Sequence, residues 1–183
     1  MSAMNNGSSS SQNGLPDSDA LPALSTNDYR TYNRMAEQMD YFHNHFRITW
    51  NQLQDACTTS GKKLLSPRQL ITTGLGFCSQ LDFHHSIEEQ HIFPVLAKKM
   101  PEFHRELTLL SQHREIHNGL AGLGEYLEKC RSGESDLDRM EVKRLMDGFG
   151  AVLWAHLDEE VNALRAENMR RYWSLKEMVA LPM

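Results

Sequence analysis

The fold class of this chain is decided by the stretch DYRTYNRMAEQMDYFHNHFRITWNQLQDAC, residues 28–57. Large side chains recur in it every three or four residues and form one stripe, which consists of Tyr32, Met35, Met39, His43, Phe46, Trp50, Leu53 and Cys57. This period is typical of an amphipathic helix with one face in a core. It predicts a helix over about residues 28–59, and it places one polar side chain, His43, in the middle of the apolar stripe.

A second helix is predicted to start near Pro67. Ser66 can act as its N-cap, and Gln69 can complete a capping box with that serine. Proline lacks a backbone N–H and clashes with the preceding turn, so we expect Pro94 to kink or end this helix.

Two further helices are predicted over about residues 102–131 and 136–168. Between them, SGESD forms a turn in which Ser135 can cap the last helix with Asp138 three residues on. Four long helices of similar length with short polar loops predict an all-α fold, an up-down-up-down antiparallel four-helix bundle.

The two ends of the chain differ from this pattern. Residues 1–27 consist mainly of Ser, Asn, Gly, Asp and Pro, which cannot bury enough apolar surface to offset the entropy of ordering, and they predict a disordered polar tail. The bundle is assigned to residues 28–168. In the C-terminal extension, residues 169–183, we expect a short helix that lies on the bundle or on a partner.

Composition excludes several classes of protein. The 183 residues carry a net charge of −5, which gives no electrostatic reason to expect a nucleic-acid partner. No apolar run is long enough to span a bilayer, and the N-terminus lacks the features of a signal peptide, so no membrane is expected. Three scattered cysteines do not make a disulfide scaffold. We therefore expect a cytoplasmic protein.

Histidine and glutamate occupy core positions on all four predicted helices. Burying a polar side chain costs free energy unless it finds a hydrogen-bond or metal partner. Polar residues at core positions recur on each of the four helices, so a shared partner is expected. Counted from the loops, these residues lie within one or two helical turns of one level of the bundle. Three of the helices present them as i,i+4 pairs, which project toward one point. The set is His43, His84 with Glu88, His113 with His117, and His156 with Glu160.

Imidazole and carboxylate without thiolate favour iron, with zinc and manganese as open alternatives. Two roughly octahedral metals need about twelve coordination positions. Five histidines, two bridging glutamates and an oxo or hydroxo bridge fill all but one of them. A dinuclear site with one open position is what binding of a small molecule such as dioxygen requires.

These motifs also carry a resemblance. FHNHF (42–46), HHSIEEQHIFP (84–94), SQHREIH (111–117) and WAHLDEEV (154–161) resemble the hemerythrin family and its HHE cation-binding relatives, over roughly residues 28–165. The resemblance implies a four-helix bundle around a non-heme di-iron centre. It also implies that the five histidines are terminal ligands and that Glu88 and Glu160 are bridges. Oxygen-carrying hemerythrins have an aspartate one residue later as the last bridge, whereas Glu160 follows the HHE-type pattern.

Two choices of helix register follow from neighbouring residues. The stripe through His84 and Glu88 is free of charge, whereas the one through His85 and Glu89 includes Asp82, so we predict His84 and Glu88 as ligands. On the first helix, His43 shares the apolar stripe and His45 lies about 200° away from it. We therefore expect four histidines at solvent-facing, supporting or loop positions: His45, His85, His91 and His104.

Three functions fit these residues. The first is a binding protein whose di-iron site takes up dioxygen or a related small molecule for transport, storage or sensing. The second is an oxidase or oxygenase that acts on a small organic substrate, and an apolar pocket beside the metal would favour it. The third is a metal-responsive module that binds a protein. The sequence leaves the oligomeric state open.

Overall fold

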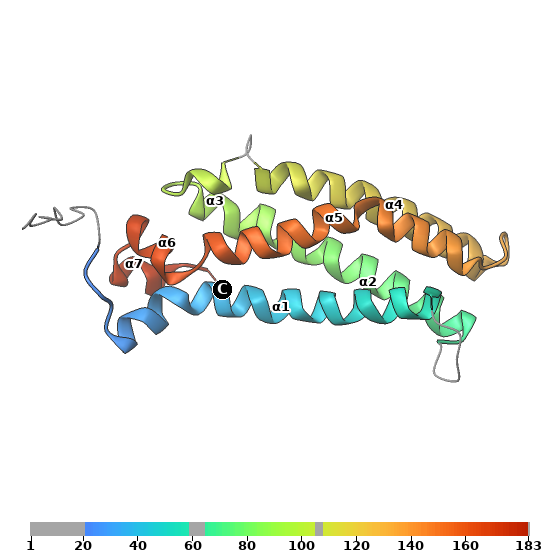
Figure 1. Ribbon diagram of the computed structural model, residues 1–183. Coiled ribbons are helices and arrows are strands. Elements are labelled where there is room, and N and C mark those ends of the chain that lie inside the picture. The colour runs from blue at the N-terminus through green and yellow to red at the C-terminus, as the bar shows by residue number, and fades with distance from the viewer. Residues whose placement is uncertain (1–20, 59–64, 105–107, 183) are drawn as a thin grey trace, which may run out of the picture.

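The computed structural model describes residues 21–58, 65–104 and 108–182, and the secondary structure of this part of the chain is helical, with no strand. Four long helices lie alongside one another (Figure 1). They are α1 (Thr26–Thr58), α2 (Pro67–Ile87), α4 (Thr108–Ser132) and α5 (Arg139–Ala163). Shorter elements complete the fold: a π-helical segment (Glu88–Ile92), α3 (Phe93–Leu96), a 3₁₀ turn (Pro101–Phe103), α6 (Ala166–Tyr172) and α7 (Leu175–Ala180).

The four long helices contact one another in a ring. Helix α4 packs against α5 and α2, and α1 packs against the same two helices from the other side. Their apolar side chains form two separate clusters. On α1, Phe46 belongs to one cluster and Met39 to the other. His43 lies between them, so the predicted polar site occupies the boundary between two dry cores.

The predicted start and interruption of the second helix are confirmed. Helix α2 begins at Pro67, where the Gln69 N–H donates to Ser66 Oγ over 3.3 Å and the Ser66 N–H donates to Gln69 Oε1 over 2.9 Å. Before Pro94, the Phe93 N–H donates to the carbonyl of Glu88, five residues back. This π-helical turn is the interruption, and such turns are frequent at functional sites.

The two predicted helices that follow have different boundaries. Helix α4 begins at Thr108 and not near 102, because Pro101 starts a 3₁₀ turn; residues 105–107 lie outside the described part. Asp138 and not Ser135 caps α5: its extended backbone lets the carboxylate accept the Met140 N–H over 2.8 Å. Helix α5 ends at Ala163, since Arg165 has an extended backbone before α6.

The ends of the chain are described in part. Residues 1–20 of the predicted tail lie outside the described residues, and α1 begins at Thr26, two residues before the predicted start. The C-terminal extension forms two short helices that lie against α1 (Figure 1). Trp173 and Met178 are buried in the same apolar cluster as Met39. Among the helices of the described residues, none has the length and hydropathy to cross a membrane.

Gly119→Ala is expected to destabilise the protein by about 1–3 kcal/mol, because a Cβ there would lie 2.4 Å from the Phe149 ring and force the packed α4–α5 interface apart. Gly124→Ala, on the same helix, meets no atom within 4 Å and should be neutral or stabilising by up to about 1 kcal/mol. Urea unfolding of both variants measures the difference. Equal stabilities would contradict the close approach of α4 and α5.

Candidate metal centre

The structure brings six of the seven predicted ligands together. The side chains of His43, Glu88, His113, His156 and Glu160 are completely buried, and 12% of the His84 side chain is exposed. They come from α1, from α2 and the π-helical turn after it, from α4 and from α5. The predicted convergence of four helices at one level therefore appears in the structure for these six residues.

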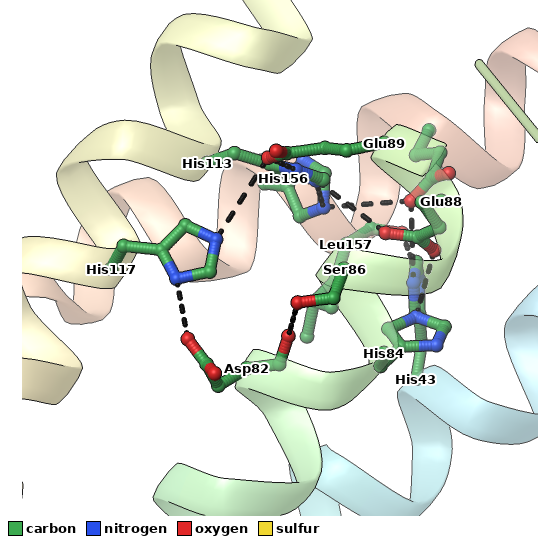
Figure 2. A network of polar contacts seen from close by, with 11 residues as sticks. His43, Asp82, His84, Ser86, Glu88, Glu89, His113, His117, His156 and Leu157 are labelled. Carbon is green, nitrogen blue, oxygen red and sulfur yellow. Dashed lines mark hydrogen bonds and ion pairs between the residues drawn. The ribbon is translucent and has the colours of Figure 1, made fainter. Parts of the chain in front are cut away.

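The carboxylate of Glu88 lies between histidines of two helices. Its Oε1 is 2.9 Å from Nε2 of His84, and its Oε2 is 3.5 Å from Nε2 of His113. Figure 2 shows His84 and His43 on one side of Glu88, and His113 and His156 on another. Two oxygens that face two separate groups of imidazoles have the disposition of a bridging ligand.

Glu160 has a similar position on the opposite helix. Its Oε2 lies 3.4 Å from Nε2 of both His43 and His156. The Nε2 atoms of His113 and His156 are 3.2 Å apart. Potential ligand atoms within 4.8 Å of one another form overlapping groups around this centre: His43, His84 and Glu88; His43, His156 and Glu160; His85, Glu88, His113 and His156; and, less buried, Glu89, His113 and His117.

His85 is the residue that the sequence argument missed. Its side chain is completely buried, and its ring stacks on that of His113 with centroids 3.9 Å apart and planes 12° from parallel. Of the positions expected for His85, a solvent-facing or loop one is therefore wrong, and one that supports the centre is not contradicted. Helix α2 has a wide buried face, so neighbouring residues reach different partners: His84 approaches His43, with centroids 5.4 Å apart, while His85 approaches α4 and α5. The other three histidines set aside, His45, His91 and His104, are exposed as expected.

His117 lies at the edge of the buried set. Its side chain is 30% exposed, and its Nδ1 is 2.8 Å from Oδ1 of Asp82. Its Nε2 is 3.8 Å from Oε1 of Glu89. Figure 2 shows His117 turned toward these two carboxylates. In this arrangement it supports the centre from outside, through a carboxylate that also contacts His113.

Hydrogen bonds outside the centre fix the orientation of two imidazoles. His113 Nδ1 lies 2.8 Å from Oε1 of Glu89, and His43 Nδ1 lies 3.0 Å from the carbonyl of Leu157. If each Nδ1 carries the proton and donates it, each Nε2 is left with a lone pair toward the centre. This is the usual arrangement around metal-bound histidines, in which the outer partner sets the tautomer.

Several polar atoms in the centre make no hydrogen bond of suitable geometry among the described residues, although the two carboxylates lie within ion-pair distance of imidazoles. They are both carboxylate oxygens of Glu88 and of Glu160, Nε2 of His43 and of His84, both ring nitrogens of His85 and Nδ1 of His156. Each unsatisfied buried polar atom costs on the order of 1–3 kcal/mol. Most of them are metal-binding atoms that face a common space, so the residues present fit a metal cation.

The charge state of the centre also suits a cation. Burial, and then the carboxylate of Glu160, raise the pKa of Glu88 well above its usual range. Burial also opposes ionisation of Glu160, but His43 and His156 outweigh it and lower the pKa of that residue. Burial lowers the pKa of His84 to about 4 and that of His156 to about 3. The imidazoles of His84 and His156 are therefore neutral at pH 7, which is the form that binds metal, and a cation would favour ionisation of both carboxylates.

Without metal, the protein is expected to lose stability as the pH falls from 7 to 5. Histidines of the unfolded chain bind protons near pH 6.5, whereas the buried histidines of the folded protein stay neutral at that pH. Because their pKa values are lower in the folded state, acid pH favours unfolding. For His84 alone, lowering from 6.5 to about 4 corresponds to on the order of 3 kcal/mol once the pH reaches 4. The raised pKa of Glu88 acts in the opposite direction, but one carboxyl faces four imidazoles with lowered pKa values.

Urea midpoints of metal-stripped protein at several pH values test this prediction. His45→Ala, which removes an exposed histidine, should show the same pH dependence as the unaltered chain, and His156→Asn should show a weaker one. A midpoint that stays constant from pH 7 to 5 would contradict the burial of neutral imidazoles.

An apolar cavity of about 500 Å³ adjoins the centre. His84 and Glu88 form part of its wall, and the remaining wall comes mainly from Phe, Met and Ile side chains of α1, α2 and the π-helical turn. Pro182, near the end of the chain, also lines it. This volume lies within the usual range of small-molecule sites, about 300–1,000 Å³.

Comparisons with known proteins agree with this picture. The family model of the hemerythrin HHE cation-binding domain matches residues 34–166. A curated relative, the dimeric xanthone biosynthesis cluster protein R11 of Cryptosporiopsis sp. (strain 8999), is 28% identical over 103 residues, which are 53% of this chain and 38% of that protein. This chain thus spans well under half of the relative's length. No solved structure matches.

Proposed function

We propose that this chain, which belongs to the hemerythrin HHE cation-binding domain family, holds a non-heme di-iron centre that binds dioxygen or a related small molecule. The observation that carries the proposal is the set of buried, unsatisfied carboxylate and imidazole atoms. The overlapping ligand groups support a dinuclear centre, because they share Glu88 and His156 and are too many for one ion. The proposal includes the antiparallel up-down-up-down order of the four long helices, which the short loops led us to expect.

The buried residues would divide between the two ions. His43 and His84 lie on one side of Glu88, and His85 and His113 lie on the other. His156 lies near both groups, and Glu160 lies near His43 and His156. The structure thus favours His85 over His117 as a ligand, and the proposed set is His43, His84, His85, Glu88, His113, His156 and Glu160. When bound, the iron pair would supply the redox chemistry that dioxygen binding requires.

The protein's own residues give the centre its properties. Phe93 lies against His113 with ring centroids 5.2 Å apart, and Phe46 lies 5.1 Å from His84, so apolar rings limit the access of water. Glu89 holds the imidazole of His113, and the Leu157 carbonyl holds that of His43. The free thiols of Cys57, Cys78 and Cys130 fit the reducing cytoplasm that the sequence suggested.

The experiment for this function is anaerobic reduction of iron-reconstituted protein, followed by addition of oxygen and absorption spectroscopy. Reversible appearance and loss of an oxygen-dependent band supports a binding protein. Irreversible oxidation of the iron in a single cycle would contradict reversible binding and support the second candidate.

The second candidate is a di-iron oxidase or oxygenase. The specific observation in its favour is the cavity of about 500 Å³ whose wall includes His84 and Glu88, since a carrier of dioxygen alone does not need a space of that size. The name of the xanthone-cluster relative associates that protein with biosynthesis. Consumption of oxygen that depends on an added organic compound would distinguish this function from simple binding.

A further inference from the structure

We propose that the cavity beside His84 is a binding site for a neutral aromatic molecule, held so that it contacts the ligand side chains of the metal centre. This inference rests on the second candidate function, the di-iron oxidase or oxygenase, because it assigns the class of substrate that such an enzyme would take. Binding to the cavity itself does not require iron, and the experiments below use this difference.

The charge of the wall argues for a neutral occupant. The described residues that line the cavity include no lysine, arginine or aspartate. Their only acid, Glu88, is completely buried at its inner end. In the metal-free protein an anion would find no lysine or arginine in the wall to pair with, and its charge would stay unpaired in an apolar space. A neutral molecule avoids the cost of an unpaired charge in an apolar space.

The rings of the wall argue for an aromatic occupant. Phe42 and Phe46 flank His84, with centroid distances of 5.6 and 5.1 Å, and Phe83 lies on the same wall. Aromatic rings favour offset or edge-to-face contacts with further rings. Met35 and Met39 add flexible thioethers, which also contact aromatic rings favourably.

The exposure of these residues follows the depth of the cavity. Phe42 is 40% exposed and Phe83 is 67% exposed, whereas Glu88 is 0% exposed. The site therefore leads from an open apolar rim to a buried metal-binding carboxylate. A flat surface for a partner protein would not reach these ligands, so the geometry favours a small molecule.

Polar groups near the rim could orient the occupant. His45 Nε2 and Gln80 Oε1 lie 3.3 Å apart and join α1 to α2 at the cavity wall. On another side, Arg34 donates to the carbonyl of Leu181 over 3.0 Å and also to that of Met178. These bonds hold the C-terminal segment so that Pro182 forms part of the wall, and the cavity is therefore preformed.

A pair of fluorescent probes tests the site. N-phenyl-1-naphthylamine is neutral, and 1-anilinonaphthalene-8-sulfonate has the same ring system with a negative charge. With metal-free protein at neutral pH, the neutral probe should bind at one site, and the sulfonate should bind at least about tenfold more weakly. Equal affinities, or tighter binding of the sulfonate, would overturn the proposal.

Matched variants locate the probe. Gln38 lines the cavity and Gln52 does not; both are exposed on α1. Gln38→Trp should place an indole in the cavity and weaken binding of N-phenyl-1-naphthylamine by at least about tenfold, whereas Gln52→Trp should leave it unchanged. Circular dichroism of both variants verifies the fold. Equal affinity of the two folded variants would place the probe elsewhere and overturn the proposal.

Paramagnetic broadening measures proximity to the centre. Proton resonances of N-phenyl-1-naphthylamine should broaden with cobalt(II)-loaded protein and stay narrow with zinc-loaded protein. Binding without cobalt broadening would place the probe away from the centre and overturn the inference. If the probe binds as expected but the iron-reconstituted protein shows no reaction with oxygen, the proposed function fails and the binding site stands.

Discussion

Glu88→Gln is expected to remove nearly all bound metal from the protein. The buried carboxylate of Glu88 directs one oxygen to Nε2 of His84 and the other to Nε2 of His113, so both oxygens face imidazole nitrogens that can bind metal. A glutamine of the same shape replaces one ligand oxygen by an NH₂ group and removes the negative charge that would balance two cations. Metal analysis after gel filtration should find less than about a tenth of the content of the unaltered protein.

The adjacent acid supplies the control. Glu89 is partly exposed and contacts the outer nitrogen of His113 over 2.8 Å, so Glu89→Gln should keep the metal and weaken its affinity by about 10–100-fold. Circular dichroism shows whether both variants stay helical. Full metal content in Glu88→Gln together with loss of metal in Glu89→Gln would mean that Glu89, and not Glu88, is the ligand.

His85→Ala is expected to lose at least one of the bound metal ions, whereas His117→Ala should retain both with reduced affinity. His85 is completely buried and has two unsatisfied ring nitrogens next to His113 and His156. His117 is partly exposed, and its Nδ1 already has Asp82 as a partner. Metal content, measured together with the ultraviolet circular dichroism of each variant, gives the comparison.

The opposite result would restore His117 as a ligand. If His117→Ala loses a metal ion while His85→Ala retains both, His117 is a ligand, as the family resemblance implies, and His85 is not. The stacked contact of His85 with His113 would then be a packing contact.

Much of this centre could be predicted from the sequence, because it depends on helical periodicity. His43 and His156 occupy core positions of long amphipathic stripes, and their distances from the loops place them at one level. The same reasoning failed for His85, because it assumed one narrow buried face on each helix, which can hold only one of two adjacent residues. Helix α2 contacts α1 on one side and α4 on another, so both His84 and His85 are directed inward.

Other features of the site depend on tertiary contacts, which the periodicity of the sequence does not reveal. The partly exposed position of His117 follows from its contacts with Asp82 and Glu89. The cavity requires the C-terminal segment to fold back on α1, where Arg34 holds it. The sequence predicted Ser135 as the cap of α5 with Asp138 as its partner, whereas the extended backbone at Asp138 makes that residue the cap.

The iron content of the reconstituted protein decides whether these buried residues hold two iron ions. Protein supplied anaerobically with excess iron(II), and then freed of loosely bound metal, should contain about two irons per chain, because the buried ligands are too many for one ion. A reproducible content near one iron per chain, or retention of zinc in preference to iron, would contradict the account.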